Sequence, residues 1–143
     1  MAARKKIYLA GPLFNPAERA RNVEIAAILE RKYKVFLPQR DGFLIENLIQ
    51  DGVFINEAKL VIFNEDVEAI RSCDILLIVL EGRSVDEGAA FELGLAYGLE
   101  KVCWALKSDP RVLFPFGDNP MIEMAVSRYF TGTEELSKFI GGK

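Results

Sequence analysis

The chain has 143 residues, of which 50% are hydrophobic and 27% charged, with a net charge of −3 and no histidine. These values are typical of one globular domain over residues 1–143, and the acidic balance gives no footprint for nucleic acid. The lack of histidine excludes Ser-His-Asp triads, Cys-His pairs and His-ligated metal sites. Acid–base or nucleophilic chemistry would therefore use other side chains, such as carboxylates.

No apolar run approaches the roughly 20 residues needed to cross a bilayer. The first apolar segment, Ile7 to Phe14, contains a Gly-Pro pair and predicts a strand and turn rather than an export signal. Cys73 and Cys103 do not have the spacing of metal ligands. We therefore expect a cytoplasmic protein without membrane association, in which both thiols are reduced and belong to the core.

Strands and helices alternate along the predicted chain. In order, the patterns predict a strand at 6–10, a helix from 16 to about 31, a strand at 33–37, a loop at 38–42, mostly helix over 43–72, a strand at 75–80, a loop at 82–85, a helix at 86–99, a strand at 102–106, a loop at 107–119, a short helix near 121–126, a strand at 128–131 and a last helix from 133. Asn15 and Thr133 are the expected helix caps, and Asp51-Gly52 is expected to divide the longest helical stretch.

This alternation predicts an α/β fold, namely a flavodoxin- or Rossmann-like open parallel five-stranded sheet with helices on both faces. The run Ile75–Leu80 is apolar throughout, as expected for a central strand buried on both sides. In such sheets, ligands bind beyond the carboxyl ends of the strands.

Glu92 is the single charged residue between Gly88 and Leu99. On a helix it shares its face with small or apolar residues, so its carboxylate faces the sheet or a pocket. No Lys or Arg lies within one turn, and a buried unpaired carboxylate is costly. Glu92 is therefore a candidate functional residue. A structural glutamate paired with a distant arginine, such as Arg71, is an equal alternative from the residues alone.

Four further residues are candidates with simpler structural explanations. Asp86 opens the same helix and suits an N-cap, but it also follows a strand, where ligands bind. Asp66 lies on a predicted helix, where a charge usually faces solvent. Tyr8 lies on an inner strand and needs a partner for its hydroxyl. Gly88 and its small neighbours leave room for the close approach of a ligand or of the sheet.

Taken together, these segments resemble the nucleoside 2-deoxyribosyltransferase family. The resemblance covers nearly the whole chain in order, through the segments Ile7–Pro12, Asn64–Ile70 with Cys73–Ile75, Asp86–Gly94 and Asn119–Met121. The Asp-x-Gly-x-x-x-Glu-Leu-Gly element at residues 86–94 is the most specific of these.

The resemblance implies an enzyme that moves a 2-deoxyribosyl group between nucleobases through a covalent glycosyl intermediate, with retention of configuration. Glu92 would be the nucleophile on C1′, and Asp86 would move the proton of the departing base. Asp66 would hold the deoxyribose, and Tyr8 would position Glu92. The implied substrates are 2′-deoxynucleosides and free nucleobases, with neither a metal nor an organic cofactor.

The resemblance also implies residues that bind substrate, which are Gly11, Phe14, Gln39, Gly88, Asn119 and Met121. Asn119 would bind the 5′-hydroxyl from a neighbouring subunit, and Met121 would flank the pocket of the nucleophile. This sharing of sites implies a homo-oligomer, a dimer or larger.

Two alternatives remain open. The first is a deoxynucleoside 5′-monophosphate N-glycosidase, which would use the same Glu92 to pass the sugar to water. The uncharged loop from Gly11 to Asn15 favours a nucleoside, although Arg19 or Arg40 could contact a phosphate. The second is a non-catalytic nucleotide-sensing domain, which would have no need of an unpaired glutamate in a Gly/Ala-rich helix.

Overall fold

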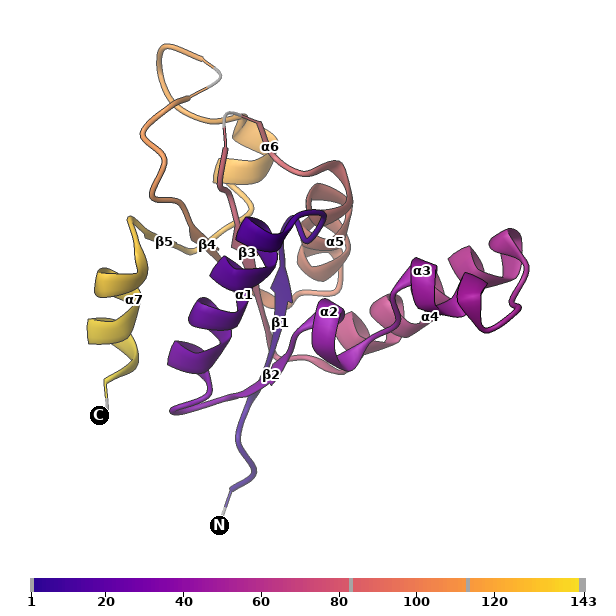
Figure 1. The fold of residues 1–143 in the computed structure, drawn as a ribbon. Coiled ribbons are helices and arrows are strands. Elements are labelled where there is room, and N and C mark those ends of the chain that lie inside the picture. The colour runs from indigo at the N-terminus through magenta and orange to yellow at the C-terminus, as the bar shows by residue number, and fades with distance from the viewer. Residues whose placement is uncertain (1, 83, 113, 142–143) are drawn as a thin grey trace.

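A computed structural model describes residues 2–82, 84–112 and 114–141 (Figure 1). Five parallel strands form one sheet in the order β2-β1-β3-β4-β5. The strands are β1 (Lys6–Ala10), β2 (Lys34–Phe36), β3 (Ile75–Val79), β4 (Val102–Leu106) and β5 (Arg128–Phe130). This is the flavodoxin-like strand order, and it confirms the predicted open parallel sheet. The order reverses between β1 and β3, where such sheets bind ligands.

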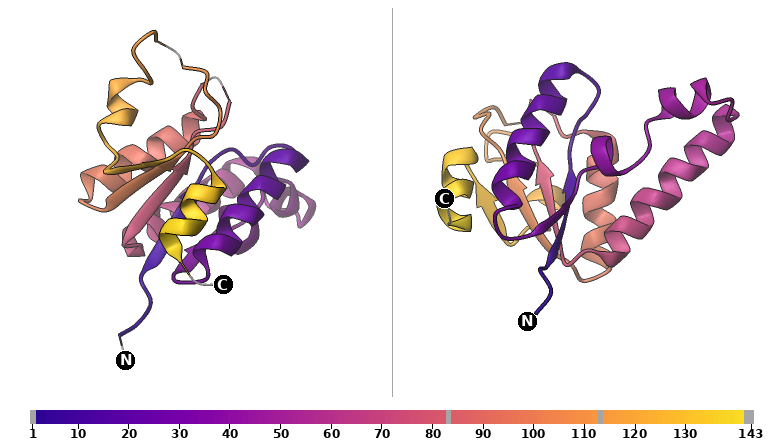
Figure 2. Two further views of the ribbon diagram at one scale, coloured as in Figure 1. Left: turned by 90° about the vertical axis from the view of Figure 1, so that its left-hand side faces the viewer. Right: turned by 60° about the horizontal axis from the view of Figure 1, so that its bottom comes forward.

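Helices cover both faces of the sheet (Figure 2). They are α1 (Pro16–Leu29), α2 (Pro38–Asp41), α3 (Ile45–Gln50), α4 (Ile55–Ser72), α5 (Glu87–Gly98), α6 (Pro120–Glu123) and α7 (Thr133–Ile140). Helices α1 and α7 pack together on one face, while α5 packs against α4 on the other. The part of the chain from α3 to the first half of α4, residues 45–63, projects beyond the sheet, and we call it the helical arm (Figure 1).

The side chains of β1 divide between two cores. Ile7 and Leu9 belong to the core beneath α1 and α7, whereas Tyr8 and Ala10 belong to the core beneath α5. Alternate side chains of a strand point to opposite faces, so this division follows from the sequence. Every residue of β3 is buried, as predicted for a central strand. Cys73 and Cys103 are free thiols buried in the α5-side core.

Side-chain caps fix the start of two helices. Asn15 accepts a hydrogen bond from the backbone N–H of Glu18, whose carboxylate accepts one in return from the N–H of Asn15, as predicted for this cap. The carboxylate of Asp86 accepts from the N–H of Ala89 and caps α5. The predicted cap at Thr133 is wrong because Thr133 is already the first residue of α7, and Gly132 precedes the helix.

Other boundaries differ from prediction. Residues 38–42, expected to form a loop, contain the short helix α2, because Pro38 suits a first helical position and its carbonyl accepts from the N–H of Gly42. The predicted break at Asp51-Gly52 is confirmed between α3 and α4, where Gly52 has a φ of 89°. The helix expected near 121–126 spans only Pro120–Glu123. Among the described residues, none of the helices has the length and apolar character that a bilayer crossing requires.

Candidate active site

A cavity of about 780 Å³ lies at the carboxyl ends of β1 and β3, bounded by the loop after β1, the helical arm, α4 and α5. It contains six of the residues singled out from the sequence, which are Gly11, Phe14, Asp66, Asp86, Gly88 and Glu92. These residues come from three separate parts of the chain, namely the loop after β1, α4 and α5 with its cap, and the fold brings them to one opening. A volume of this size accommodates a small organic ligand.

Glu92 lies on the face of α5 that turns toward the sheet. Its Oε2 accepts a hydrogen bond from the hydroxyl of Tyr8, a fully buried residue in the middle of β1. Among the described residues Glu92 forms no ion pair, and Arg71, considered above as a structural partner, is exposed. The carboxylate is therefore held by one neutral donor and remains directed at the cavity.

The surroundings of Glu92 favour its neutral form. Burial raises its pKa to about 7, and the negative charges of Asp66 and Asp86 add to this rise, while the hydrogen bond from Tyr8 opposes it. The pKa of Tyr8 is itself raised, first by burial and then by Glu92, so the phenol stays protonated and acts as a donor. A carboxylate with such a perturbed pKa in a cavity is typical of a functional site.

Three further carboxylates line the same cavity, Glu46, Asp66 and Asp86, of which the last two raise the pKa of Glu92. Asp66 lies on α4 and is partly buried, which raises its pKa to about 6. Asp86 uses Oδ2 to cap α5, and its Oδ1 has no hydrogen bond among the described residues. A side chain at position 88 would crowd this arrangement, because a Cβ on Gly88 would lie 3.3 Å from Oδ2 of Asp86. The glycine thus keeps space around the capping carboxylate.

The cavity also has an aromatic wall that the sequence analysis largely missed. Phe14, Phe43, Phe63 and Phe91 line it, and each is about half exposed or more. Only Phe14 was predicted to contact substrate. The others come from the segment before α3, from α4 and from α5, and their shared cavity depends on how the arm folds back. A phenylalanine directly before the half-buried Glu92 was the one sequence signal for this wall.

Three predicted substrate-binding residues do not line the cavity of a single chain. Both ends of the Gln39 carboxamide have protein partners, since Oε1 accepts from Asn22 at 3.1 Å and Nε2 donates to the carbonyl of Arg19 at 3.0 Å. Asn119 caps the short helix α6, and Met121 is 81% exposed there. Both lie at the outer surface, outside this chain's own cavity.

The positively charged side chains near the cavity differ in their availability. Arg19 lines it and donates to the carbonyl of Leu13, whereas Arg40 pairs with Glu30 and Asp41 away from it. In residues 2–82, 84–112 and 114–141, no three Cys, Asp or Glu side chains group closely enough to hold a metal ion. Lys59 of α4 also lines the cavity, so its wall combines carboxylates and two cationic side chains with an apolar, aromatic surface.

The chain is similar in sequence to proteins of one known family. The family pattern described as nucleoside 2-deoxyribosyltransferase matches residues 7–133. The nucleoside deoxyribosyltransferase of Limosilactobacillus fermentum is 32% identical over 120 residues, which cover 80% of this chain and 67% of that protein. An uncharacterized protein of Ureaplasma parvum is 32% identical over 104 residues, covering 71% of this chain and 65% of that protein. The chain thus spans about two thirds of the length of these two relatives.

Solved structures show the same fold. The 2-deoxyribosyltransferase of Bacillus psychrosaccharolyticus superposes with a TM-score of 0.72 at 27% identity, over 92% of this chain and 90% of that chain. The CMP N-glycosidase of Clostridium botulinum shares the fold alone, with a TM-score of 0.56 at 18% identity over 94% of this chain and 98% of that one. From the family match and these relatives, the chain belongs to the nucleoside 2-deoxyribosyltransferase family.

Proposed function

We propose that this protein transfers the 2-deoxyribosyl group between the nucleobases of 2′-deoxynucleosides, with Glu92 as the nucleophile. The observation that carries the proposal is Glu92 itself, a half-buried carboxylate that has no cationic partner among the described residues and is held by Tyr8 at the wall of a cavity of about 780 Å³. A structural glutamate would gain stability from an ion pair, and this one has none among the described residues.

In the first step, an oxygen of Glu92 attacks C1′ and forms an ester, while the bond from C1′ to the base nitrogen breaks. The electron pair of that bond leaves with the base, which takes up the proton that Asp86 carries in the reactive form of the site, in which Glu92 is the ionised carboxylate. The free Oδ1 of Asp86 is available for this transfer while Oδ2 keeps its capping bond. The negative carboxylates near C1′ stabilise the positive charge that develops on the sugar.

In the second step, a nitrogen of the acceptor base attacks C1′ and the bond to Glu92 breaks. The acceptor loses its proton to Asp86, which restores the starting state. Two displacements at the same carbon give retention of configuration, and release of the first base before the second binds gives ping-pong kinetics.

The remaining cavity residues suit the two halves of a nucleoside. The carboxylate of Asp66 can accept a hydrogen bond from a sugar hydroxyl, and Gly11 leaves space at the end of β1. The half-exposed phenylalanines, Phe14 among them, offer faces on which a nucleobase can stack. Asn119 and Met121 would reach the site from a second copy of the chain, so we propose a homo-oligomer.

The test is to incubate the protein with 2′-deoxyinosine, with and without free adenine, and to separate the products by chromatography. We expect new 2′-deoxyadenosine that requires both adenine and the protein. The absence of any product from several 2′-deoxynucleosides, at protein concentrations that give stable binding, would instead support the sensing domain.

Hydrolysis of deoxynucleoside monophosphates is a second candidate, favoured by the position of Arg19 on the cavity wall. The same chromatography distinguishes it when a 2′-deoxynucleoside 5′-monophosphate is the donor. Release of free base from the monophosphate at a rate that adenine does not change would establish hydrolysis. Formation of a new nucleoside in proportion to added adenine would establish transfer.

A further inference from the structure

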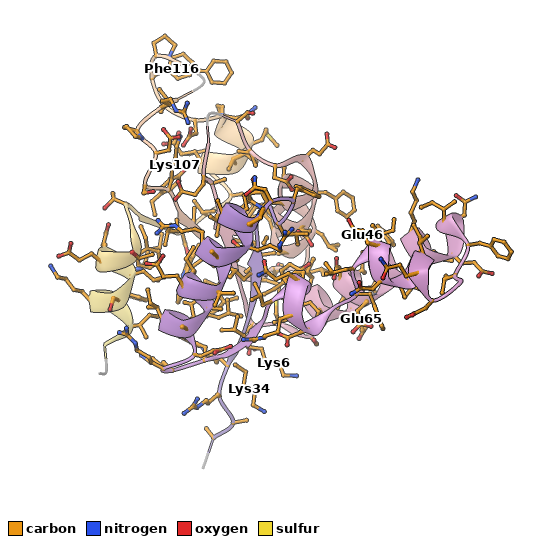
Figure 3. The ribbon with its side chains drawn as sticks, in the orientation of Figure 1. Lys6, Lys34, Glu46, Glu65, Lys107 and Phe116 are labelled. Atoms are coloured by element: carbon orange, nitrogen blue, oxygen red, sulfur yellow. The ribbon has the colours of Figure 1, made fainter. Side chains whose placement is uncertain are left out.

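A second polar cluster, largely shielded from solvent, lies away from the cavity, where the chain leaves β4 and beside the middle of β5. Nζ of Lys107 lies 2.6 Å from Oδ1 of Asp118, and the hydroxyl of Tyr129 donates to Oδ2 of Asp118 at 2.8 Å. The side chains of Lys107 and Asp118 are only 8% and 15% exposed. Figure 3 shows Lys107 beneath the loop whose outer tip carries Phe116.

We expect the cluster to fix the position of the backbone more than to increase the stability of the fold. A buried ion pair rarely stabilises a protein more than apolar residues of similar size would, because both charges lose their water. What it does provide is a defined position, since both oxygens of the Asp118 carboxylate are engaged by groups on or next to two neighbouring strands. The cluster therefore fixes the backbone at position 118 relative to the sheet.

The residue whose position this fixes is Asn119, the next in the chain. Its Oδ1 accepts a hydrogen bond of 2.9 Å from the backbone N–H of Met121, which sets the orientation of the carboxamide. Within the described chain, the amide nitrogen of Asn119 donates to no protein group, and the residue is exposed. Asn119 thus presents an oriented N–H donor at the surface, and its backbone is held in place by the contacts of the preceding residue, Asp118.

We propose that Lys107, Asp118 and Tyr129 are positioning residues, which hold Asn119 so that it can donate to the 5′-hydroxyl of a nucleoside in the cavity of a second copy. This inference rests on the proposed transferase function. It extends the site to three side chains that touch neither substrate nor Glu92. Phe116 and Met121, which flank Asn119 in the chain, are 78% and 81% exposed.

A purely structural role and a positioning role make different predictions for substrates. If the cluster only stabilises the loop, a variant loses activity equally on every donor. If it positions Asn119 for the 5′-hydroxyl, the loss is large on 2′-deoxyinosine and nearly absent on 2′,5′-dideoxyinosine, which has no such hydroxyl. Because the dideoxy donor lacks the 5′-hydroxyl, it removes the contact with Asn119 from the substrate side. Wild type and variant, each measured on both donors, therefore form a double-mutant cycle between protein and substrate.

The experiment compares kcat/KM on both donors, with adenine as acceptor, for the wild type, Tyr129→Phe, Asp118→Asn and Asn119→Ala. Tyr129→Phe is the primary variant because it removes one hydrogen bond and keeps the ion pair, so that no buried charge is left alone. Glu134→Gln is the matched control, since it breaks the exposed Lys138–Glu134 pair of α7, far from substrate.

We expect Tyr129→Phe to lower kcat/KM on 2′-deoxyinosine about tenfold and on the dideoxy donor less than about twofold, because small displacements of a binding group have large effects on rate. Asp118→Asn should lower kcat/KM on 2′-deoxyinosine by a larger factor than Tyr129→Phe does. In a protein that already carries Asn119→Ala, Asp118→Asn should lower this kcat/KM no further. Equal losses on both donors in Tyr129→Phe would overturn the positioning role. A wild type that transfers from neither 2′-deoxyinosine nor any other 2′-deoxynucleoside would refute the proposed function itself, which is a separate outcome.

Discussion

The hydroxyl of Tyr8 donates a hydrogen bond to Oε2 of Glu92 and joins residues that are 84 positions apart in the sequence. Tyr8 sits in the middle of β1, buried within the core, while Glu92 lies on α5 at the cavity. The bond favours the ionised carboxylate, whereas burial and the neighbouring Asp66 and Asp86 disfavour it. The pKa of Glu92 therefore reflects a balance that single substitutions can shift.

Replacing Tyr8 with Phe should move the acidic limb of the pH profile toward higher pH. The wild-type nucleophile is ionised above a pKa of about 7, so kcat/KM should fall as the pH drops below this value. Without the Tyr8 donor the pKa of Glu92 rises further, and the loss should be greater at pH 6 than at pH 9. The measurement is kcat/KM against pH on 2′-deoxyinosine.

Tyr33→Phe provides the matched control for this profile, because Tyr33 packs on the opposite core, beside Trp104. The Tyr33→Phe variant should lose kcat/KM at low pH over the same pH range as the wild type. A limb that is unchanged in Tyr8→Phe would mean that Tyr8 does not set the ionisation of the nucleophile.

Glu92→Gln should stabilise the protein at neutral pH and should not do so in acid. The folded pKa of Glu92 is raised from its ordinary value of 4.5 to about 7, so the unfolded chain ionises first as the pH increases. Stability from the protonated form is thus complete below pH 4.5 and is lost between 4.5 and 7 in the wild type. Gln stays neutral and avoids this loss, which amounts to about 3 kcal/mol.

The measurement is the free energy of unfolding in urea at pH 4 and pH 8 for the wild type and Glu92→Gln. Glu68→Gln, on the exposed face of α4, serves as the control and should change little at either pH. A Glu92→Gln variant that is less stable than the wild type at pH 8 would show that the ionised carboxylate is stabilising, contrary to the site described here.

The capping role of Asp86 and the proton transfer proposed for it can be separated by different substitutions. Asn caps helices as well as Asp does, so Asp86→Asn should keep the stability of α5 but lower kcat by about 10²- to 10⁴-fold, since the proton carrier is gone. Asp86→Ala should lose the same activity and about 1 kcal/mol of stability as well, because the N–H of Ala89 loses its acceptor. Full activity in Asp86→Asn would exclude proton transfer by this residue.

The sequence predicts much of this site because local rules govern it. The run of small residues around Glu92, the cap at Asp86 and the alternation along β1 each indicate where a side chain points. The resemblance then joins them into one site, and the fold brings Glu92, Asp86 and Asp66 to one cavity.

The remainder depends on tertiary contacts that no local pattern encodes. The inward positions of Phe43 and Phe63 depend on the angle at which the helical arm leaves the sheet (Figure 1). Gln39 was expected to contact substrate, but its carboxamide bonds to Asn22, a buried polar residue whose pairing the sequence does not reveal. The Lys107–Asp118 pair joins the two ends of the long loop between β4 and α6, and the sequence gives no sign of this contact.

Mixing the inactive Glu92→Ala variant with the impaired Asn119→Ala variant should raise activity if Asn119 acts in a second copy. Glu92→Ala lacks the nucleophile and Asn119→Ala lacks the surface donor, so a mixed dimer contains one site with both. After denaturation and joint refolding in equal amounts, about a quarter of the wild-type sites should be complete. The measurement is the transfer rate of the mixture against that of each variant refolded alone. A mixture no more active than the average of the two would place Asn119 and Glu92 in the same chain's site or leave Asn119 without a role.

The central claim is that Glu92 carries the sugar between the two bases. It is tested most directly by quenching the protein with acid during turnover of excess 2′-deoxyinosine without acceptor, then mapping its peptides by mass spectrometry. The account predicts a peptide containing Glu92 that is heavier by one 2-deoxyribosyl group and returns to its original mass when adenine is added before the quench. Transfer that continues in Glu92→Ala, or a sugar attached to a different residue, would contradict it.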